Sequence, residues 1–375
     1  MKVLVINWRD MKNPEAGGAE THIDEILKRK PKDWQVDFVS AAFPGCIDEE
    51  DINGYHVIRI PDNFRFNFTF RKYWKTRFQY NNYDLVIDDI SKIPLAVHRY
   101  IKDIPVLAID HHIHGKSLFS ELFFPLALYV YTMERHFLRY YRDVPTICVS
   151  ASTKDALEKH FGLKNTFLSY NGVTFTEIRA NSGFPKEKAP TLLYIGRLKK
   201  YKRVEHIIKA FHKVLEAVPG TNLWIAGKGD REDALKALCG ELKIESRVTF
   251  FGFIDDAKKY EIMSRAWAYS IASEKEGWGI AVIESNAAGL PAVGYRVEGL
   301  IDSISDGFSG FLVENGDYLQ MAERITRLFT DAPLLKEISK NAIEWASRFS
   351  WENTADEFYT IAADVVSAFN KGKAV

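Results

Sequence analysis

Short apolar runs alternate with longer segments of helical pattern along the whole chain. Each run is rich in Val, Ile, Leu and Phe, which is typical of strands that helices cover on both faces of a parallel sheet. In the first half the runs occupy residues 3–7, 36–40, 56–60, 85–88, 106–110 and 147–150. In the second half they occupy residues 192–196, 222–227, 248–252, 268–272 and 291–295. The pattern predicts an α/β chain with two doubly wound, Rossmann-like sheets.

The segment after the first strand of the second half has a helical period. Its apolar residues fall on one face of a helix with 3.6 residues per turn. They are Val204, Ile207, Ile208, Phe211, Val214, Leu215 and Val218. Because Pro219 and Gly220 follow, we predict a helix that begins near Val204 and stops before Pro219.

Residues 179–190 interrupt both periods with Gly, Pro, Ser and Lys, as a linker does. We therefore expect an N-terminal domain at residues 1–180 and a second domain at residues 181–350. A chain of 375 residues is long enough for two domains, each with its own core. Ligands of doubly wound sheets bind beyond the carboxyl ends of the strands, so two such domains facing one another would form a cleft.

Composition narrows the class of partner and the compartment. Fifty basic residues balance fifty acidic ones, which argues against the broad positive surface that nucleic-acid binding requires. The three cysteines lie far apart without metal-ligand spacing, which fits a reducing compartment. The first apolar run is too short for a signal peptide, and no long uncharged apolar stretch follows. We expect a cytoplasmic protein that at most rests on the inner face of a membrane.

Two loops that follow predicted strands carry groups able to bind anions. Gly17 and Gly18 stand just before a predicted helix, where backbone amides can bind an anion or simply form a tight entry turn. In the second half, cations crowd the start of the helix that begins near Val204. They are Arg197, Lys199, Lys200, Lys202 and Arg203. These cations oppose the helix macrodipole unless an anion such as pyrophosphate neutralises them, and an ordinary solvated charge run is the alternative.

Two acids flank a Gly-Trp-Gly loop at residues 277–279. Glu276 lies in the loop, and Glu284 lies about one turn into the helix that follows. A carboxylate at the position of Glu284 can accept hydrogen bonds from ribose hydroxyls, and Glu276 would then point at the group beyond the phosphates. The alternative is that Glu276 caps the helix and Glu284 is a surface acid.

Four segments, taken in order, carry a family resemblance. They are GGAE at 17–20, GRLKKYK at 196–202, SEKEGWGIAVIE at 273–284 and NAAGLPAV at 286–293. Further support comes from residues 149–157, 170–173, 248–256, 306–313 and 349–358. The ordered set resembles the retaining glycosyltransferases of family four over nearly the whole chain. The resemblance implies the GT-B fold, with two Rossmann-like domains facing across a cleft and a C-terminal helix at 351–375 that returns to the N-terminal domain.

The resemblance also implies a nucleotide-diphosphate sugar as the donor substrate. Arg197 and Lys202 would hold the pyrophosphate, while Glu284 would bind the ribose. Glu276 would bond hydroxyls of the transferred sugar. The remaining contacts implied are the amides of Gly277, Trp278, Gly279 and Ile280 beside Glu276, the segment Gly252, Phe253 and Ile254 against the base, and Gly17 and Gly18 near the donor phosphates.

Retention at the anomeric carbon, without a bound metal or cofactor, is a further implication. Arg, Lys and helix amides would neutralise the leaving diphosphate, whose own oxygen would accept the acceptor's proton while an oxocarbenium-like centre forms. Glu276 would orient and stabilise rather than attack. Residues 87–91 lack the aspartate spacing of metal-dependent transferases.

A histidine facing the transferred sugar is implied after the strand at 106–110. The run there is HHIH, so His111 and His112 compete for this role, and bonding of either imidazole to nearby backbone is the alternative. We choose His111, which gives a catalytic set with Arg197, Lys202 and Glu276. A zinc site at His112 and His114 lacks the Cys or spaced carboxylate that would complete a ligand set.

The acceptor is expected to be a glycan or a lipid-linked glycan. Residues 63–83 combine many aromatic side chains, Phe64 among them, with five cations, and residues 122–133 form an apolar run too short to span a bilayer. Core packing explains both segments in part, and peripheral contact with an anionic membrane is the functional hypothesis. Two rival functions are a sugar-nucleotide epimerase of the same architecture and a noncatalytic two-domain binding protein.

Overall fold

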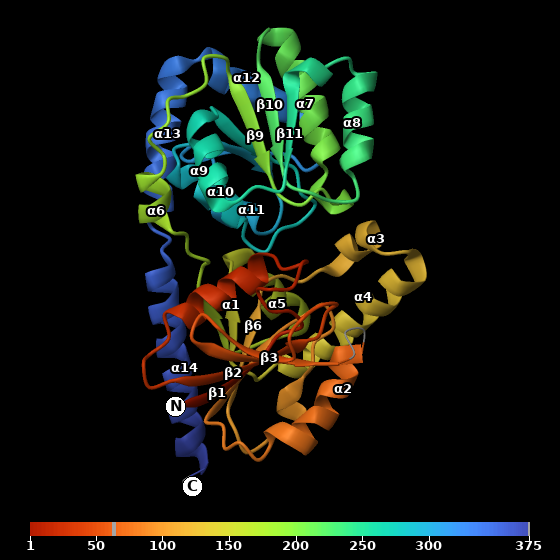
Figure 1. Cartoon of the computed structure of the whole chain (residues 1–375), viewed down its shortest axis with the longest axis vertical. Coiled ribbons are helices and arrows are strands. Elements are labelled where there is room, and N and C mark those ends of the chain that lie inside the picture. The colour runs from red at the N-terminus through yellow and green to blue at the C-terminus, as the bar shows by residue number, and fades with distance from the viewer. Residues whose placement is uncertain (62–64, 374–375) are drawn as a thin grey trace. The chain divides into compact units, whose positions relative to one another are not determined.

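The structure is a computed structural model that describes residues 1–61 and 65–373. The chain forms two compact units (Figure 1). The first comprises Met1–Leu118, Phe123–Gly172 and Trp351–Val375, and the second comprises Phe119–Leu122 and Val173–Ser350. The chain enters the second unit before residue 180, where the sequence placed the boundary, because helix α6 (Phe175–Ala180) packs against α10 (Ile280–Ala287) of that unit.

The first unit is built on an eight-stranded sheet in the order β3-β4-β2-β1-β5-β6-β7-β8. The strands are β1 Lys2–Ile6, β2 Gln35–Ala41, β3 Glu49–Ile52, β4 Tyr55–Ile60, β5 Leu85–Asp89, β6 Val106–Asp110, β7 Thr146–Cys148 and β8 Thr166–Leu168. All pair in parallel except β3, which runs antiparallel to β4. The six predicted strands are confirmed, whereas the acidic β3 and the three-residue β8 carry no continuous apolar run and were not predicted.

Helices cover both faces of the first sheet. The helices of this unit are α1 Gly18–Lys28, α2 Phe66–Tyr73, the π-helical turn η2 Trp74–Phe78, η3 Val97–Arg99, η4 Gly115–Ser117, α4 Phe124–Leu138, η5 Arg139–Tyr141, α5 Ala151–Phe161 and α14 Trp351–Lys373. The short helix α3, Leu118–Glu121, belongs from Phe119 onwards to the second unit. One core cluster joins α2, η2 and the end of α4, while the other joins α1 and α14. Phe358 and Ala362 of α14 belong to that second core, and the Tyr359 hydroxyl donates to the Ile26 carbonyl at 2.6 Å.

The second unit has a six-stranded parallel sheet in the order β11-β10-β9-β12-β13-β14. The strands are β9 Thr191–Ile195, β10 Asn222–Ala226, β11 Val248–Gly252, β12 Ala268–Ile271, β13 Ala292–Tyr295 and β14 Gly310–Val313. The five predicted strands are confirmed, and β14 was not predicted as a strand. Besides α6 and α10, the helices are η6 Lys200–Lys202, α7 Val204–Ala217, α8 Glu232–Glu241, η7 Glu245–Arg247, α9 Asp256–Arg265, α11 Leu300–Ser303, α12 Tyr318–Thr330 and α13 Ala332–Ala346. Helix α7 confirms the predicted helix.

Each sheet has a topological switch point, where consecutive connections leave a central strand towards opposite edges. In the first unit β1 lies between β2 and β5, so the switch falls between β1 and β5. In the second unit β9 lies between β10 and β12, so the switch falls between β9 and β12. Ligands of open α/β sheets bind beyond the carboxyl ends of strands at such points. No helix within residues 1–61 and 65–373 is long and apolar enough to cross a membrane.

Candidate active site

The loops after β9 and β12 bring a lysine and a glutamate together at the switch point of the second unit. The Lys202 ammonium lies 2.5 Å from Oε1 of Glu276, and the Ser273 hydroxyl donates to the same oxygen at 2.6 Å. Burial alone would lower the pKa of Lys202, but the Glu276 carboxylate more than offsets this and raises that pKa. The amine is therefore held in its charged form, beside a carboxylate, at the expected position of a ligand.

Glycines allow the loops at this edge to cross closely. A Cβ on Gly227 would lie 1.9 Å from the Gly196 carbonyl oxygen, and one on Gly229 would lie 2.2 Å from the Leu198 carbonyl oxygen. The Gly227 amide also donates to the Gly252 carbonyl at 2.7 Å. The loops after β9, β10 and β11 are thus packed backbone to backbone, which no residue with a side chain permits at Gly227 or Gly229.

The loop that carries Glu276 packs closely against Gly299. A Cβ on Gly299 would lie 2.4 Å from the Glu276 carbonyl oxygen, and the φ of Gly299 is +77°. The indole of Trp278 is buried and meets the ring of Phe349 edge to face, with centroids 5.0 Å apart. Gly279, at φ +98°, is the N-cap of α10. Positive φ at both glycines sets the turn, so residues 276–280 follow one defined path into the helix.

Glu284, in the second turn of α10, is paired rather than free. Its Oε1 lies 2.8 Å from the ammonium of Lys259 on α9. Burial opposes the charge on Lys259, and the carboxylates of Glu284 and Asp256 outweigh it and raise the pKa of that amine. Lys259 thus holds the Glu284 carboxylate in one orientation on α10.

The other predicted residues of this unit lie around the same strand ends. The Arg197 guanidinium donates to the Tyr201 hydroxyl at 2.9 Å. Arg203 binds Glu274 at 3.0 Å and Asn315 at 2.9 Å, which removes it from the expected cluster of loose cations. After β11, Phe253 is 79% exposed and Ile254 is partly buried, so the segment offers an apolar surface on which a flat ring can stack.

At the switch point of the first unit, three polar side chains form a chain of hydrogen bonds. Asp89 accepts from the Asn7 side-chain amide at 2.7 Å, and its other oxygen lies 2.8 Å from Nε2 of His111. Burial opposes protonation of His111, but Asp89 outweighs it and raises the pKa of that imidazole. His22, edge to face with His111 at 5.1 Å, is fully buried, and burial lowers its pKa to about 3. The two neighbouring rings therefore differ, because Asp89 favours the protonated form of His111 whereas burial keeps His22 neutral.

The neighbouring histidines lie in a different environment. The rings of His112 and His114 are 4.2 Å apart, and His114 lies 3.3 Å from Glu134, which also accepts from the amides of His114 and Gly115. Within the described parts of the chain, no three His, Cys, Asp or Glu side chains form a group that could hold a metal ion.

The Gly17–Gly18 turn is anchored from two directions. The Gly17 amide donates to the Glu20 carboxylate at 2.7 Å, so this amide already has an acceptor. Upstream in the same loop, Asp10 forms a two-pronged ion pair with the buried Arg59, with both N–O distances 2.8 Å. Arg59 outweighs the effect of burial and holds the pKa of Asp10 below its ordinary value. An anion at Gly17 would have to displace Glu20.

Sequence reasoning found the strand-end loops but missed the residues that hold them. Those residues are Asn7, Glu20, His22, Asp89, Ser273, Gly227, Gly229, Lys259 and Gly299. The Gly-Lys-Gly run directly after β10 was a usable signal, because glycines that follow a strand allow close backbone approach. The pairings of Glu276 with Lys202 and of Glu284 with Lys259 gave no signal, because these partners lie 74 and 25 residues away in the chain.

The fold is that of the GT-B glycosyltransferases. Sucrose-phosphate synthase from Thermosynechococcus elongatus superposes with a TM-score of 0.79 at 21% identity, over 98% of this chain and 99% of that one. Anabaena HepE, in a crystal structure with UDP-glucose, has a TM-score of 0.74 at 20% identity, over 99% and 100% of the two chains. At these identities the likeness concerns the fold.

Two family models adjoin along the chain. The model for glycosyl transferases group 1 matches residues 174–345, and the model for glycosyltransferase family 4 matches residues 16–177. The chain belongs to this group 1, family 4 type of glycosyltransferase. A curated relative, N-acetyl-alpha-D-glucosaminyl L-malate synthase of Bacillus anthracis, is 30% identical over 53% of this chain. That alignment covers 51% of the relative's length, and the alignments with two further curated relatives cover 64% and 49% of their lengths.

Proposed function

We propose that the protein transfers a sugar from a nucleotide-diphosphate sugar to an acceptor hydroxyl with retention at the anomeric carbon. The observation that carries the proposal is the Lys202–Glu276 pair at the β9/β12 switch point, where a buried cation and an acid lie 2.5 Å apart. A diphosphate accepts hydrogen bonds from a cation such as Lys202, and sugar hydroxyls donate hydrogen bonds to a carboxylate such as Glu276.

Each residue near the pair has a task in this scheme. Lys202 and Arg197 bind the diphosphate, Glu284 accepts from the ribose, and the base stacks at Phe253. Glu276 accepts from hydroxyls of the transferred sugar once the donor phosphate has drawn the Lys202 ammonium away. The amides of residues 277–280, at the start of α10, add positive potential near the leaving group.

The reaction breaks the bond between the anomeric carbon and the diphosphate oxygen and forms one bond from that carbon to the acceptor oxygen. The acceptor's proton passes to the departing phosphate oxygen, so no protein base is needed. The cations lower the energy of the diphosphate as its charge develops, and this term is worth about 3 kcal/mol per well-placed donor. In this proposal no metal takes part, since Lys202 and Arg197 carry the neutralising charge.

His111 completes the proposal from the first unit. The roles proposed for this unit are a hydrogen bond from His111 to the transferred sugar and binding of donor phosphate by Gly17–Gly18. Asp89 would then keep His111 charged, and the ring would donate a hydrogen bond to a sugar oxygen.

The test is a panel of uridine, guanosine and adenosine diphosphate sugars. A ligand that binds the native state raises the melting temperature, so the preferred donor shows as the largest shift. Glu276→Ala should abolish transfer from that donor and leave the melting temperature of the free protein within a few degrees. Near-normal turnover in this variant would refute the role of Glu276. Release of an altered sugar nucleotide without any acceptor would point to an epimerase instead.

For the acceptor we propose a lipid-linked glycan met at a membrane surface. The start of α4 exposes five large apolar side chains, Phe123, Phe124, Leu126, Leu128 and Tyr129. Phe123 and Phe124 are 69% and 68% exposed, which is more apolar surface than a short helix on a soluble face usually shows.

The neighbouring segment supplies positive charge. In the stretch 63–83, Phe66, Phe70, Trp74 and Phe78 are core residues, so core packing explains most of its aromatic content, while Asn63 and Phe64 lie outside the described residues. Arg71, Lys72 and Lys75 are exposed on α2 and η2, which pack into the same core cluster as Leu138 at the end of α4. Exposed aromatic side chains and exposed cations on one unit are typical of peripheral membrane contact.

Flotation with anionic liposomes tests this surface. The wild-type chain should float with the liposomes at low salt, and the double variant Phe123→Ser, Phe124→Ser should stay in the pellet fraction. The matched control is Leu319→Ser on α12 of the second unit, where a leucine is 51% exposed. Equal flotation of wild type and the double variant would exclude α4 as the contact.

A further inference from the structure

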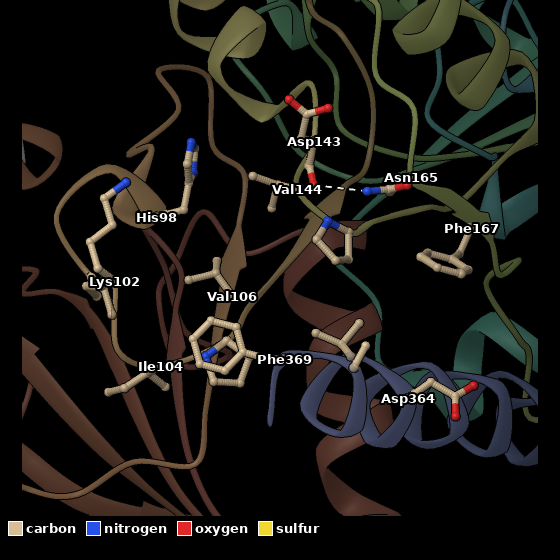
Figure 2. Close-up of a pocket in the computed structure, with 15 residues that line it drawn as sticks. His98, Lys102, Ile104, Val106, Asp143, Val144, Asn165, Phe167, Asp364 and Phe369 are labelled. Atoms are coloured by element: carbon tan, nitrogen blue, oxygen red, sulfur yellow. Dashed lines mark hydrogen bonds between the residues drawn. The ribbon is translucent and has the colours of Figure 1, made fainter. Parts of the chain in front are cut away.

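A pocket of about 540 Å³ opens at the amino-terminal edge of the first sheet (Figure 2). Val106 begins β6, while Pro145 and Asn165 directly precede β7 and β8. Helix α14 closes the opposite side with Val365, Ala368 and Phe369. His111 follows the carboxyl end of β6, and Asp89 ends β5, which pairs with β6. The pocket is therefore separated from them by the length of the sheet, and the proposed transfer reaction makes no use of it.

The floor of the pocket is apolar and rigid. Pro105 and Pro145 line it, and proline has no amide donor to leave unsatisfied there. Their carbonyls are engaged inside the sheet, since Pro105 accepts from the Val86 amide at 3.0 Å and Pro145 from the Ala108 amide at 2.8 Å. The floor thus presents hydrocarbon without a backbone group that needs water, and its shape is fixed by strand pairing.

The wall from α14 is also fixed. Phe358 and Ala362, one to two turns before the lining residues, are buried in the core, so the helix cannot move away without opening it. At the mouth, Phe167 of β8 remains 38% exposed, so a ligand can enter from solvent. The volume falls within the range of about 300–1,000 Å³ that small-molecule sites occupy.

Few polar groups line the pocket, and on one side Lys102 supplies positive charge beside His98, whose pKa burial lowers to about 4, so that this ring is neutral. His98 and Lys102 lie together on that side, away from Phe167 and Asp364 (Figure 2). Nδ1 of His98 is buried without a hydrogen-bond partner, and the side chain of Lys102 is exposed to solvent. On the other rim, the Asp143 carboxylate is already paired with Lys164 at 3.0 Å, and its carbonyl accepts from Asn165 at 3.0 Å.

We propose that this pocket binds the anion of a medium-chain fatty acid, with its carboxylate at His98 and Lys102 and its hydrocarbon chain over Pro105, Val106 and Phe369. A neutral apolar molecule would leave the buried Nδ1 of His98 without a partner and the Lys102 charge unmatched by a ligand, and a sugar or nucleotide would find few hydrogen-bond partners along the floor. An aliphatic carboxylate satisfies both parts of the site at once.

Titration calorimetry with decanoate, below the concentration at which it forms micelles, tests the proposal on the full chain. Wild type should bind one decanoate saturably. Ala368→Trp, which fills the pocket from α14, should weaken binding at least about tenfold, whereas Ala363→Trp should not change it, because Ala363 is exposed on the same helix outside the pocket. Transfer activity in the absence of decanoate should be the same in all three proteins, because none of these residues belongs to the proposed catalytic site.

A substitution of an exposed residue tests the proposal without disturbing the core. Lys102→Glu alters an exposed side chain and should weaken decanoate binding about threefold or more, through lost attraction and new repulsion. Decanol should bind more weakly than decanoate to wild type and equally to wild type and Lys102→Glu. No saturable binding by wild type, equal binding by Ala368→Trp, or equal affinity for decanol and decanoate would each overturn the proposal.

Discussion

Removing the charge of Lys202 and removing that of Glu276 should have opposite effects on diphosphate binding, because the two side chains contact one another. In the free protein the two charges neutralise one another, with side chains only 15% and 13% exposed. A diphosphate must compete with Glu276 for the Lys202 ammonium. Removing the amine should weaken diphosphate binding, whereas removing the charge of Glu276 should strengthen it while stopping transfer.

The size of each effect follows from the environment of the pair. Lys202→Met removes a charge-assisted hydrogen bond to phosphate, worth about 1.5–3 kcal/mol, and should raise the Kd of the nucleoside diphosphate about 10- to 150-fold. Glu276→Gln removes the competitor. If the pair is worth about 0.5–1 kcal/mol in the free protein, the same Kd should fall about two- to fivefold, because Ser273 still holds the amide oxygen in place.

Titration calorimetry with the nucleoside diphosphate of the preferred donor measures both constants, and a coupled assay of diphosphate release measures turnover. Lys213→Met is the matched control, because Lys213 is 44% exposed on α7 and paired only with Glu216. The reasoning fails if Glu276→Gln weakens diphosphate binding as Lys202→Met does, or if it retains turnover. Either result would mean that the two side chains do not exchange partners when the donor binds.

Three further predictions address the scaffold. Because Asp89 holds the pKa of His111 above its ordinary value, their pairing stabilises the fold fully below about pH 6.5, and this stabilisation is lost as pH rises through the raised pKa. In urea unfolding, Asp89→Asn should therefore lose more unfolding free energy near pH 5.5 than near pH 8.5. An equal loss at both pH values would contradict the pairing. Arg59→Met leaves Asp10 charged and buried and should cost about 3–5 kcal/mol of unfolding free energy. The double variant Asp10→Leu, Arg59→Met should recover part of this loss. If the losses of the two single variants simply add in the double variant, the two side chains are not directly coupled. Gly299→Ala should reduce turnover far more than diphosphate affinity, because the new Cβ meets the Glu276 carbonyl oxygen. The control Gly316→Ala, also at positive φ but facing open space, should change the melting temperature alone. Indistinguishable turnover in the two variants would show that Gly299 does not position Glu276.

Continuous apolar runs and helical period made much of the fold predictable from sequence. Strand β6 and helix α7 follow directly from residues 106–110 and from the spacing that begins at Val204. Strand β3 could not be found this way, because three of its four residues are acidic and it is held by pairing with β4 at the edge of the sheet. Pairing across an edge is a tertiary effect that leaves no local period.

The candidate site was predictable as a set of loops and not as a set of contacts. The HHIH run gives no reason to separate His111 from His112, and the difference in environment arises because Asp89 ends the adjacent strand. In the same way, Glu276 meets Lys202 because β9 and β12 are neighbours in the sheet although 74 residues separate the two side chains. Which strands are neighbours is a property of topology that a single sequence does not contain.

Helix α14 has a consequence for how the chain is made. It contributes Phe358 and Ala362 to the core of a unit whose sheet is finished by residue 168, so that core lacks these side chains while the ribosome adds residues 173–350 of the second unit. Domains usually fold as they emerge, from the N-terminus onwards. Here the half that is synthesised first must wait for the last segment, and during that interval it is the part of the nascent chain that a chaperone would protect.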